Sequence, residues 1–179
     1  MTATSNEDLQ AHLDPTGESV QLLLKRNLTG PIVMLNLLRL RATADYRQHP
    51  DLTPAEPISG SEAFRRYVRH TEPFLKSSGG RILFIGQGGN YFIGPATERW
   101  DVMMLVEQSS LADFFAFADD AAYLAGIGHR VAAAEDSRLL PLVRDSPQAP
   151  TADGSEALGA RRGASDVPAR PGLTQDLEA

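Results

Sequence analysis

The pattern of apolar and polar positions predicts two facing β-strands in the middle of the chain. The stretch from Gly79 to Glu107 contains an apolar run at residues 81–86 and a second run at residues 99–107, which carries the only tryptophan. Glycine clusters and Pro95 separate the runs, which is typical of a β-hairpin with a long, irregular turn. We therefore expect the rest of the domain to be organised around this hairpin.

Two further strands are predicted, one before and one after this hairpin. Residues 31–38 (PIVMLNLL) are apolar nearly throughout, with Asn36 as the one polar exception, which is typical of a strand covered on both faces. Residues 136–143 (DSRLLPLV) predict a final short strand. Pro141 favours an edge position for it, because proline has no N–H to donate to a neighbouring strand.

Helical periodicity is clearest in residues 61–76, where aromatic and aliphatic side chains recur on one face. Ser61 is the expected N-cap, and Gly79-Gly80 is the expected stop. Shorter helices are expected near residue 5, at residues 18–26 and, with breaks around Gly126 and Gly128, between residues 110 and 135.

The order strand, helix, strand, strand, helix, strand predicts an α+β, ferredoxin-like βαββαβ fold. We expect this domain at residues 30–144, after an N-terminal helical extension at residues 1–29. Residues 145–179 contain no aromatic residue and many Pro, Ala, Gly, Ser and charged residues, so we expect a disordered tail. The connection at residues 39–59 is long for a compact domain, and we expect it either to be functional or to form a flap.

Composition and charge narrow the classes of function. The net charge of -6 and the pI of about 5.2 argue against binding to nucleic acid. The absence of cysteine excludes disulfides, thiolate catalysis and thiolate metal sites. No apolar run approaches the roughly 18 to 20 residues of a membrane helix, and the first ten residues are polar and acidic. We therefore expect a cytoplasmic protein with no membrane contact.

A sheet with helices on one face leaves an apolar face without cover, and a second copy of the chain is the simplest partner for it. We therefore expect a homodimer.

Four segments in order resemble one protein family: GPIVMLNLLRLR, the GGR-LF-G run at residues 79–86, ERWDVMMLVE and HRVAAAEDSRLLPL. Together they are similar to the DUF1330 family of the dimeric α+β barrel superfamily. The resemblance implies a ferredoxin-like protomer whose sheet packs against that of a second protomer. It implies no particular reaction, because the superfamily includes cofactor-free monooxygenases, isomerases, polyketide cyclases, haem-using members and ligand-binding domains of regulators.

Three polar residues are candidate catalytic groups. His129 suits acid–base chemistry, since its reference pKa lies near 6.5; the alternative is a surface histidine at the start of a helix. Asn36 must be hydrogen-bonded if it is buried, either to a substrate carbonyl or oxyanion or to a neighbouring strand. Asp101 could act as a base if it faces the helices together with Asn36. Otherwise it forms an ion pair with Arg99 at the end of a strand.

Two aromatic residues are candidates for substrate binding. Trp100 could stack on a substrate or anchor the core or a dimer, and it shares its strand face with Val102, Met104 and Val106, opposite Asp101. Tyr67 lies on the apolar helical stripe, but its hydroxyl group needs a partner and could reach a pocket.

Two arginines complete the candidate substrate-binding set. Arg130 could clamp a carboxylate or hold Glu135 or Asp136 in an ion pair. Arg81 could bind a ligand or pair with Glu98 across the hairpin.

We expect neither a metal ion nor a cofactor. The four histidines contain no i, i+4 pair of the kind that binds zinc on a helix. The glycines at residues 86–89 do not precede a helix, so they do not form a phosphate-binding loop. The less favoured alternative is a haem bound by His129.

These features favour a small, cofactor-independent enzyme that acts on a hydrophobic, oxygenated small molecule. Isomerisation, cyclisation, bond cleavage by a lyase or cofactor-free oxygenation would all suit the candidate residues. The alternative is a non-catalytic, dimeric ligand-binding or accessory protein.

Overall fold

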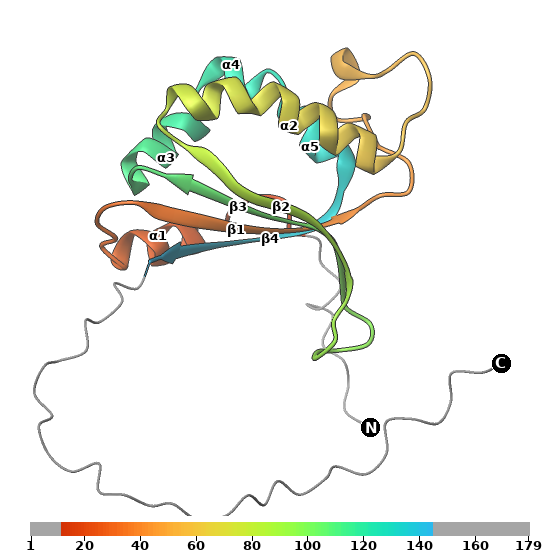
Figure 1. The fold of residues 1–179 in the computed structure, drawn as a ribbon. Helices are drawn as coiled ribbons and strands as arrows, with labels where there is room; N and C mark the ends of the chain where they lie inside the picture. The colour runs from red at the N-terminus through yellow and green to blue at the C-terminus, as the bar shows by residue number, and fades with distance from the viewer. Residues whose placement is uncertain (1–11, 145–179) are drawn as a thin grey trace, which may run out of the picture. The chain divides into compact units, whose positions relative to one another are not determined.

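The computed structural model describes residues 12–144, which form a four-stranded antiparallel sheet with helices over one face (Figure 1). The strand order β2-β3-β1-β4 is that of a ferredoxin-like α+β fold, as predicted, and β4 lies at an edge, as Pro141 indicates. The helix expected near residue 5 and the expected tail at residues 145–179 lie outside the described residues. The strands are β1 (Ile32–Leu40), β2 (Arg81–Asn90), β3 (Arg99–Gln108) and β4 (Ala134–Val143).

Side chains cap the two main helical regions. The Ser59 hydroxyl oxygen accepts a hydrogen bond from the Glu62 N–H at 3.2 Å, and that of Ser110 accepts one from the Asp113 N–H at 3.1 Å. Ser61 is therefore not the cap that we expected, because α2 begins earlier, directly after the extended backbone of Ser59. The helices are α1 (Gly17–Lys25), η2 (Pro50–Leu52, a 3-10 turn), α2 (Gly60–Ser77), α3 (Leu111–Ala118), α4 (Ala121–Leu124) and α5 (Gly128–Ala133).

The hydrophobic core lies between α2 and the face of the sheet that the helices cover. Phe64, Tyr67 and Leu75 of α2 share this core with Leu38 of β1 and Met104 of β3. Since side chains alternate along a strand, the neighbours of Met104 in β3 point to the opposite face.

The opposite face of the sheet is apolar, and helices α2 to α5 all lie on the other side (Figure 1). Leu35 pairs with Leu105 of β3 and with Leu140 of β4, and Leu37 pairs with Met103. Leu140 remains 51 % exposed. We call this surface the open face; its composition is that of a surface that another molecule covers.

The central hairpin is longer than its apolar pattern indicates. β2 continues past Gly86 to Asn90, so the glycines at residues 86–89 lie within the strand and not in the turn. Gly88 lies so close to β3 that an added Cβ atom would clash with the Trp100 carbonyl oxygen. Glycine thus permits the two strands to approach each other at this position.

The long connection between β1 and α2 packs against α5. The Arg41 N–H donates to the Ala133 carbonyl, and the Asp45 N–H donates to the Ala132 carbonyl, both at 2.9 Å. Tyr46 is buried, with 7 % of its surface exposed. These contacts hold the middle of the connection beside the last helix.

Gly60, the first residue of α2, provides a test of this packing. An added Cβ atom would lie 2.8 Å from the Ala133 carbonyl oxygen and closer still to that of Arg41. Backbone atoms cannot rotate away, so we expect Gly60→Ala to lower the free energy of unfolding in urea by about 1–3 kcal/mol. Gly17→Ala is the matched control, because Gly17 also begins a helix and a Cβ atom there meets nothing within 4 Å. Equal stability of the two variants would contradict the expectation.

Candidate functional site

The packing of the connection against α5 brings Tyr46 to His129. The Tyr46 hydroxyl oxygen lies 2.8 Å from His129 Nδ1, and the two rings meet edge to face with their centroids 5.7 Å apart. Tyr46 is buried and His129 is half-buried. No described side chain forms a hydrogen bond with the second ring nitrogen, Nε2, so this atom is the one that can exchange a proton with a small molecule.

Burial lowers the pKa of His129, and the positive charges of Arg66, His70 and Arg69 lower it further. Burial raises the pKa of Tyr46. At neutral pH the pair therefore consists of a neutral imidazole and a protonated phenol.

The neutral pair has two tautomers that differ in the role of Nε2. If the imidazole proton is on Nδ1, it is donated to the Tyr46 oxygen and Nε2 can accept a proton. If the proton is on Nε2, Tyr46 donates to Nδ1 and the Nε2–H can donate to a substrate oxygen. The hydrogen bond with Tyr46 thus couples the protonation of one nitrogen to the role of the other.

Two further histidines lie against the glycines that flank the start of α5. A Cβ atom added to Gly126 would clash with the His70 ring, and one added to Gly128 would clash with the His49 ring. The His70 Nε2 lies 3.0 Å from the Ala122 carbonyl oxygen. The sequence indicated these glycines only as breaks between helices. In the structure they leave room for the His70 and His49 rings close to His129.

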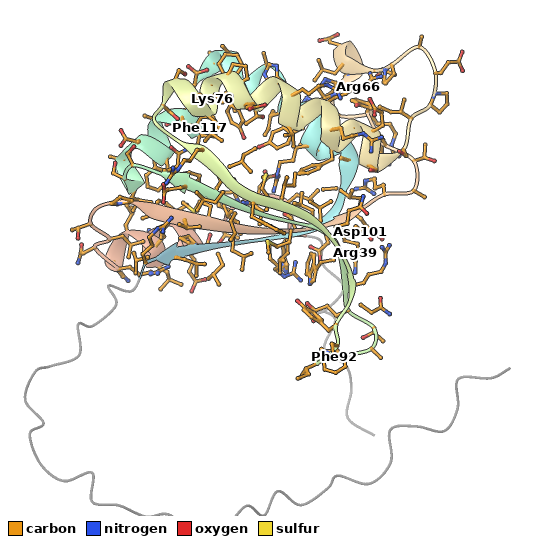
Figure 2. All side chains as sticks on the ribbon, in the orientation of Figure 1. Arg39, Arg66, Lys76, Phe92, Asp101 and Phe117 are labelled. Atoms are coloured by element: carbon orange, nitrogen blue, oxygen red, sulfur yellow. The ribbon has the colours of Figure 1, made fainter. Side chains whose placement is uncertain are left out.

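Arg66 of α2 (Figure 2) belongs to a group of charged residues on this helix in which positive charges outnumber negative ones. Glu62 forms ion pairs with Arg65 at 2.9 Å, with Arg66 at 3.3 Å and with Arg69 at 3.4 Å. Hydrogen bonds from Arg65 and Arg66 lower the pKa of Glu62. One carboxylate thus faces three guanidinium groups, and the excess positive charge would attract an anionic group.

Asn36 and Tyr67, two of the predicted site residues, both have partners within the protein. Asn36 lies in the middle of β1, and its Nδ2 donates to the Met34 carbonyl oxygen at 3.1 Å. The Tyr67 hydroxyl lies 3.1 Å from that of Tyr123, and burial raises the pKa of Tyr123. No hydrogen bond among the described residues links either side chain to His129.

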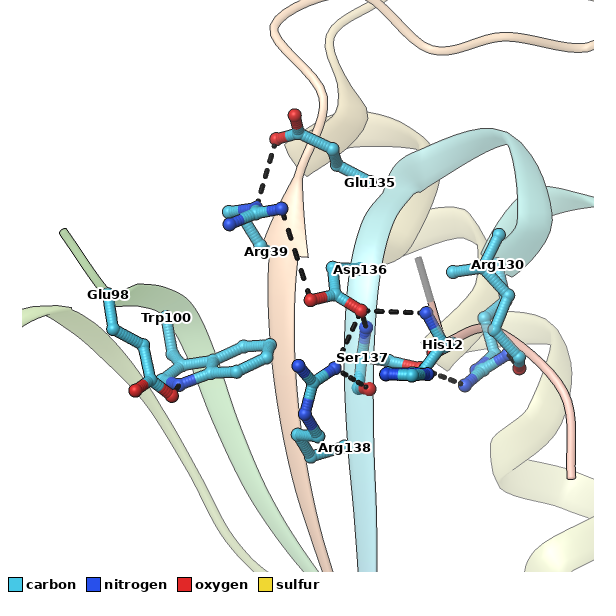
Figure 3. A network of polar contacts seen from close by, with 10 residues as sticks. His12, Arg39, Glu98, Trp100, Arg130, Glu135, Asp136, Ser137 and Arg138 are labelled. Atoms are coloured by element: carbon cyan, nitrogen blue, oxygen red, sulfur yellow. Dashed lines mark hydrogen bonds and ion pairs between the residues drawn. The ribbon is translucent and has the colours of Figure 1, made fainter. Parts of the chain in front are cut away.

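Asp136 is the centre of a separate polar network (Figure 3). Its Oδ1 accepts hydrogen bonds from the His12 N–H at 2.8 Å and from Arg138 at 2.7 Å. Burial alone would raise the pKa of Asp136, but these donors outweigh it and lower the pKa. The network joins the segment before α1 to β4.

Trp100 and Arg130 belong to this network and not to the Tyr46–His129 pair. The Arg138 guanidinium lies 5.0 Å from the centre of the Trp100 ring, and the Trp100 Nε1–H donates to Glu98 at 2.9 Å (Figure 3). Arg130 donates to the Leu13 carbonyl oxygen and to Ser137 Oγ. Both side chains thus have their polar partners within the protein.

Asp101 and Arg81 form ion pairs at the ends of strands. Asp101 pairs with Arg99 and accepts a hydrogen bond from the Leu40 N–H at 2.7 Å. Arg81 pairs with Glu107 at 2.7 Å. The expected pair with Glu98 is wrong, because the register of β2 and β3 places Arg81 opposite Glu107.

Two open hollows, of about 440 and 340 Å³, lie beside the connection. Arg41 and Asp45 line both, and Tyr46 and His129 line neither. Within residues 12–144, no three His, Asp or Glu side chains are placed to hold a metal ion. Nor does that part of the chain contain a helix of the length and apolarity needed to cross a membrane.

Comparison with solved structures identifies a close relative. The methylated RPA0582 protein is 38 % identical, with a TM-score of 0.66, and the match covers 78 % of this chain and 98 % of that one. A second structure of RPA0582, from Rhodopseudomonas palustris and described as of unknown function, is 39 % identical, with a TM-score of 0.65, and the match covers 77 % and 100 %.

A more distant structure is a dimeric protein of unknown function with a ferredoxin-like fold from Bacteroides fragilis. It is 16 % identical, with a TM-score of 0.39, and the match covers 63 % of this chain and 94 % of that one. No family model and no curated protein matches the chain. The resemblance to DUF1330 therefore stays a prediction.

The lowered pKa of His129 predicts a pH dependence of stability. An unfolded histidine titrates near pH 6.5, so below that pH the unfolded chain binds more protons than the folded protein. The free energy of unfolding should therefore fall as the pH drops from about 7 to 5. In His129→Gln this fall should be smaller, as measured by urea unfolding at several pH values.

Tyr46→Phe is the control for this experiment. It removes one hydrogen bond and should cost about 1 kcal/mol, but stability should still fall between pH 7 and 5, because burial and the neighbouring positive charges lower the pKa of His129. A pH dependence that is the same in wild type and His129→Gln would contradict the assignment.

Proposed function

This chain belongs to the same family as the RPA0582 protein, and we propose that it is a cofactor-independent enzyme that transfers protons on a hydrophobic, oxygenated small molecule. The observation that carries the proposal is the 2.8 Å contact between the Tyr46 hydroxyl and His129 Nδ1. A neutral, partly desolvated imidazole held in one orientation by a buried phenol is suited to general acid–base catalysis.

The simplest reaction is proton transfer next to a carbonyl group. His129 Nε2 removes a proton from the carbon beside the carbonyl, and the electron pair of the broken C–H bond moves to form an enolate. Positive charge from Arg66 stabilises the enolate oxygen. In a substrate with a conjugated double bond, return of the proton to the far carbon of the dienolate completes an isomerisation. Alternatively, the enolate carbon attacks a second carbonyl within the substrate, and transfer of the proton from His129 to the new alkoxide completes a cyclisation.

Asn36 has a supporting role in this proposal. One N–H of its amide is used by the Met34 carbonyl oxygen, which leaves the second N–H and the amide oxygen for a substrate carbonyl or hydroxyl group. The remaining predicted site residues all have contacts within the protein that account for their positions, and we assign them no contact with the substrate. These residues are Asp101, Trp100, Tyr67, Arg130 and Arg81.

A second candidate function is non-catalytic binding of a small molecule by a dimer. The two open hollows favour it, because both lie beside the connection and neither is lined by His129. This function requires a ligand to bind without being converted.

A substrate screen separates the two functions. Full-length protein would be incubated with a panel of β-diketones, polycyclic phenols and hydroxylated quinones, with thermal stabilisation, mass spectrometry of products and oxygen uptake as readouts. We expect turnover of at least one compound, a loss of 10²-fold or more in His129→Gln and a smaller loss in Asn36→Ala.

Glu56→Gln is the control variant for the screen. Glu56 is an exposed residue of the same connection that carries Tyr46, and it lies outside the Tyr46–His129 pair and lines neither hollow, so its replacement should leave turnover unchanged. Full activity in His129→Gln would refute the assignment of the base. Thermal stabilisation without product for every compound that binds would support the non-catalytic function.

We further propose that the protein is a cytoplasmic homodimer in which the open faces of two sheets pack together. The support is the apolar composition of this face, where Leu35, Leu37, Met103 and Leu105 lie at its centre. Sheets that pack face to face lie about 10 Å apart and bury such side chains between them.

Leu140→Lys tests the dimer. The side chain is half-exposed on the open face, so the change should leave the protomer folded but place a charge in the interface. By light scattering at micromolar concentration we expect a dimer mass for wild type and a monomer mass for the variant. Leu124→Lys on α4, which is 42 % exposed on the helix side, should stay dimeric. A monomer mass for wild type would contradict the proposal.

A further inference from the structure

The end of the central hairpin leaves the sheet and projects on the side of the open face (Figure 1). We call residues 88–98 the hairpin arm. Its tip carries Phe92, which is fully exposed (Figure 2), together with Ile93, which is 86 % exposed, and the partly exposed Tyr91. Large apolar side chains gathered at the end of a projecting hairpin are typical of a contact with another molecule.

The arm is also poor in charge. Residues 82–97 contain no Asp, Glu, Lys or Arg, although charged residues make up 22 % of the whole chain. Arg81 and Arg99, which lie close to the two ends of this stretch, are held in ion pairs with Glu107 and Asp101. The chemistry of the arm therefore fits an apolar protein surface.

The size of the arm limits the possible partners. One large aromatic side chain buries about 150–250 Å², whereas a stable interface needs about 800 Å² from each partner. Phe92, Tyr91 and Ile93 cannot supply that area alone. A stable partner must therefore also contact the neighbouring surface, and on the side to which the arm projects this surface is the open face.

We propose that the hairpin arm clasps a second copy of this chain, with Phe92 and Ile93 packed on the surface of that copy. The proposal depends on the proposed homodimer, since the copy that covers the open face is the molecule that the arm meets. Two-fold symmetry supplies two arms, so each protomer both contributes an arm and receives one. The arm thus adds area at the margin of the interface, beyond the sheet itself.

Other occupants fit the arm less well. Hairpins and helices that bind anionic membranes combine apolar residues with Lys or Arg, and residues 82–97 have neither. Residues 145–179 of the same chain contain no aromatic residue and offer few apolar side chains to pack on the tip.

The absence of cysteine permits a direct test in the full-length protein. Phe92→Cys and, as a control, Leu124→Cys would each be labelled with a maleimide dye whose emission depends on polarity. The protein would then be diluted from micromolar to nanomolar concentration while its mass is followed. We expect the dye at position 92 to report an apolar surrounding in the dimer and water in the monomer. The dye at position 124 should not change.

A second measurement removes the apolar tip. The double substitution Phe92→Ser and Ile93→Ser should raise the dissociation constant of the dimer about tenfold or more, measured by sedimentation equilibrium. Both side chains project from the fold, so their loss should not alter the thermal stability of the protomer. Leu124→Ser should leave the dissociation constant unchanged.

The outcomes distinguish the arm from the dimer on which it depends. A wild-type protein that is monomeric at micromolar concentration overturns both. A dimer in which the dye at position 92 stays in water, or in which the double variant associates as tightly as wild type, overturns the arm alone. The arm proposal is also overturned if the dye is shielded equally at all concentrations, which indicates cover by the same chain, or only when vesicles of anionic phospholipid are added.

Discussion

The packing of α2 against one face of the β1–β3 pair is the constraint on which the rest of the structure depends. Phe64, Tyr67 and Leu75 fill the space above Leu38 and Met104. Because the helices after β1 and β3 both return to this face, the opposite, apolar face is not covered by α2 to α5. The candidate site lies on the covered side of the sheet. The two proposed contacts with a second copy, the open face and the hairpin arm, lie on the side that these helices leave uncovered.

The candidate site arises at the margin of that core. Hydrogen bonds from Arg41 and Asp45 to the end of α5 hold the long connection in place, and they bring the Tyr46 hydroxyl to His129. The same packing withdraws both side chains from water, which lowers the pKa of His129 and raises that of Tyr46. The packing of the connection against α5 thus provides the geometry of the pair and, together with the positive charges on α2, the protonation states that acid–base chemistry requires.

Several candidate residues have structural roles that local pattern could not reveal. Asp136 was expected at the start of the last strand, as a possible ion-pair partner of Arg130, yet it accepts a hydrogen bond from the backbone N–H of His12, 124 residues earlier in the chain. The Arg138 guanidinium lies over the Trp100 ring, a contact between β4 and β3 across β1, which separates these strands in the sheet. The glycines at residues 86–89 have a composition typical of a turn, but pairing with β3 incorporates them into a strand.

The sequence by itself determined the order of the elements, the ferredoxin-like fold, the edge position of β4 and the choice of His129 as a candidate. These features follow from periodicity, from turn residues and from side-chain chemistry, all of which act within a few residues. Only the tertiary structure decided that Tyr46 is the partner of His129, that Arg81 pairs with Glu107, and that the end of the hairpin leaves the sheet. Tyr46 and His129 are 83 positions apart, and a contact at that distance depends on the packing of whole elements, which no local pattern encodes.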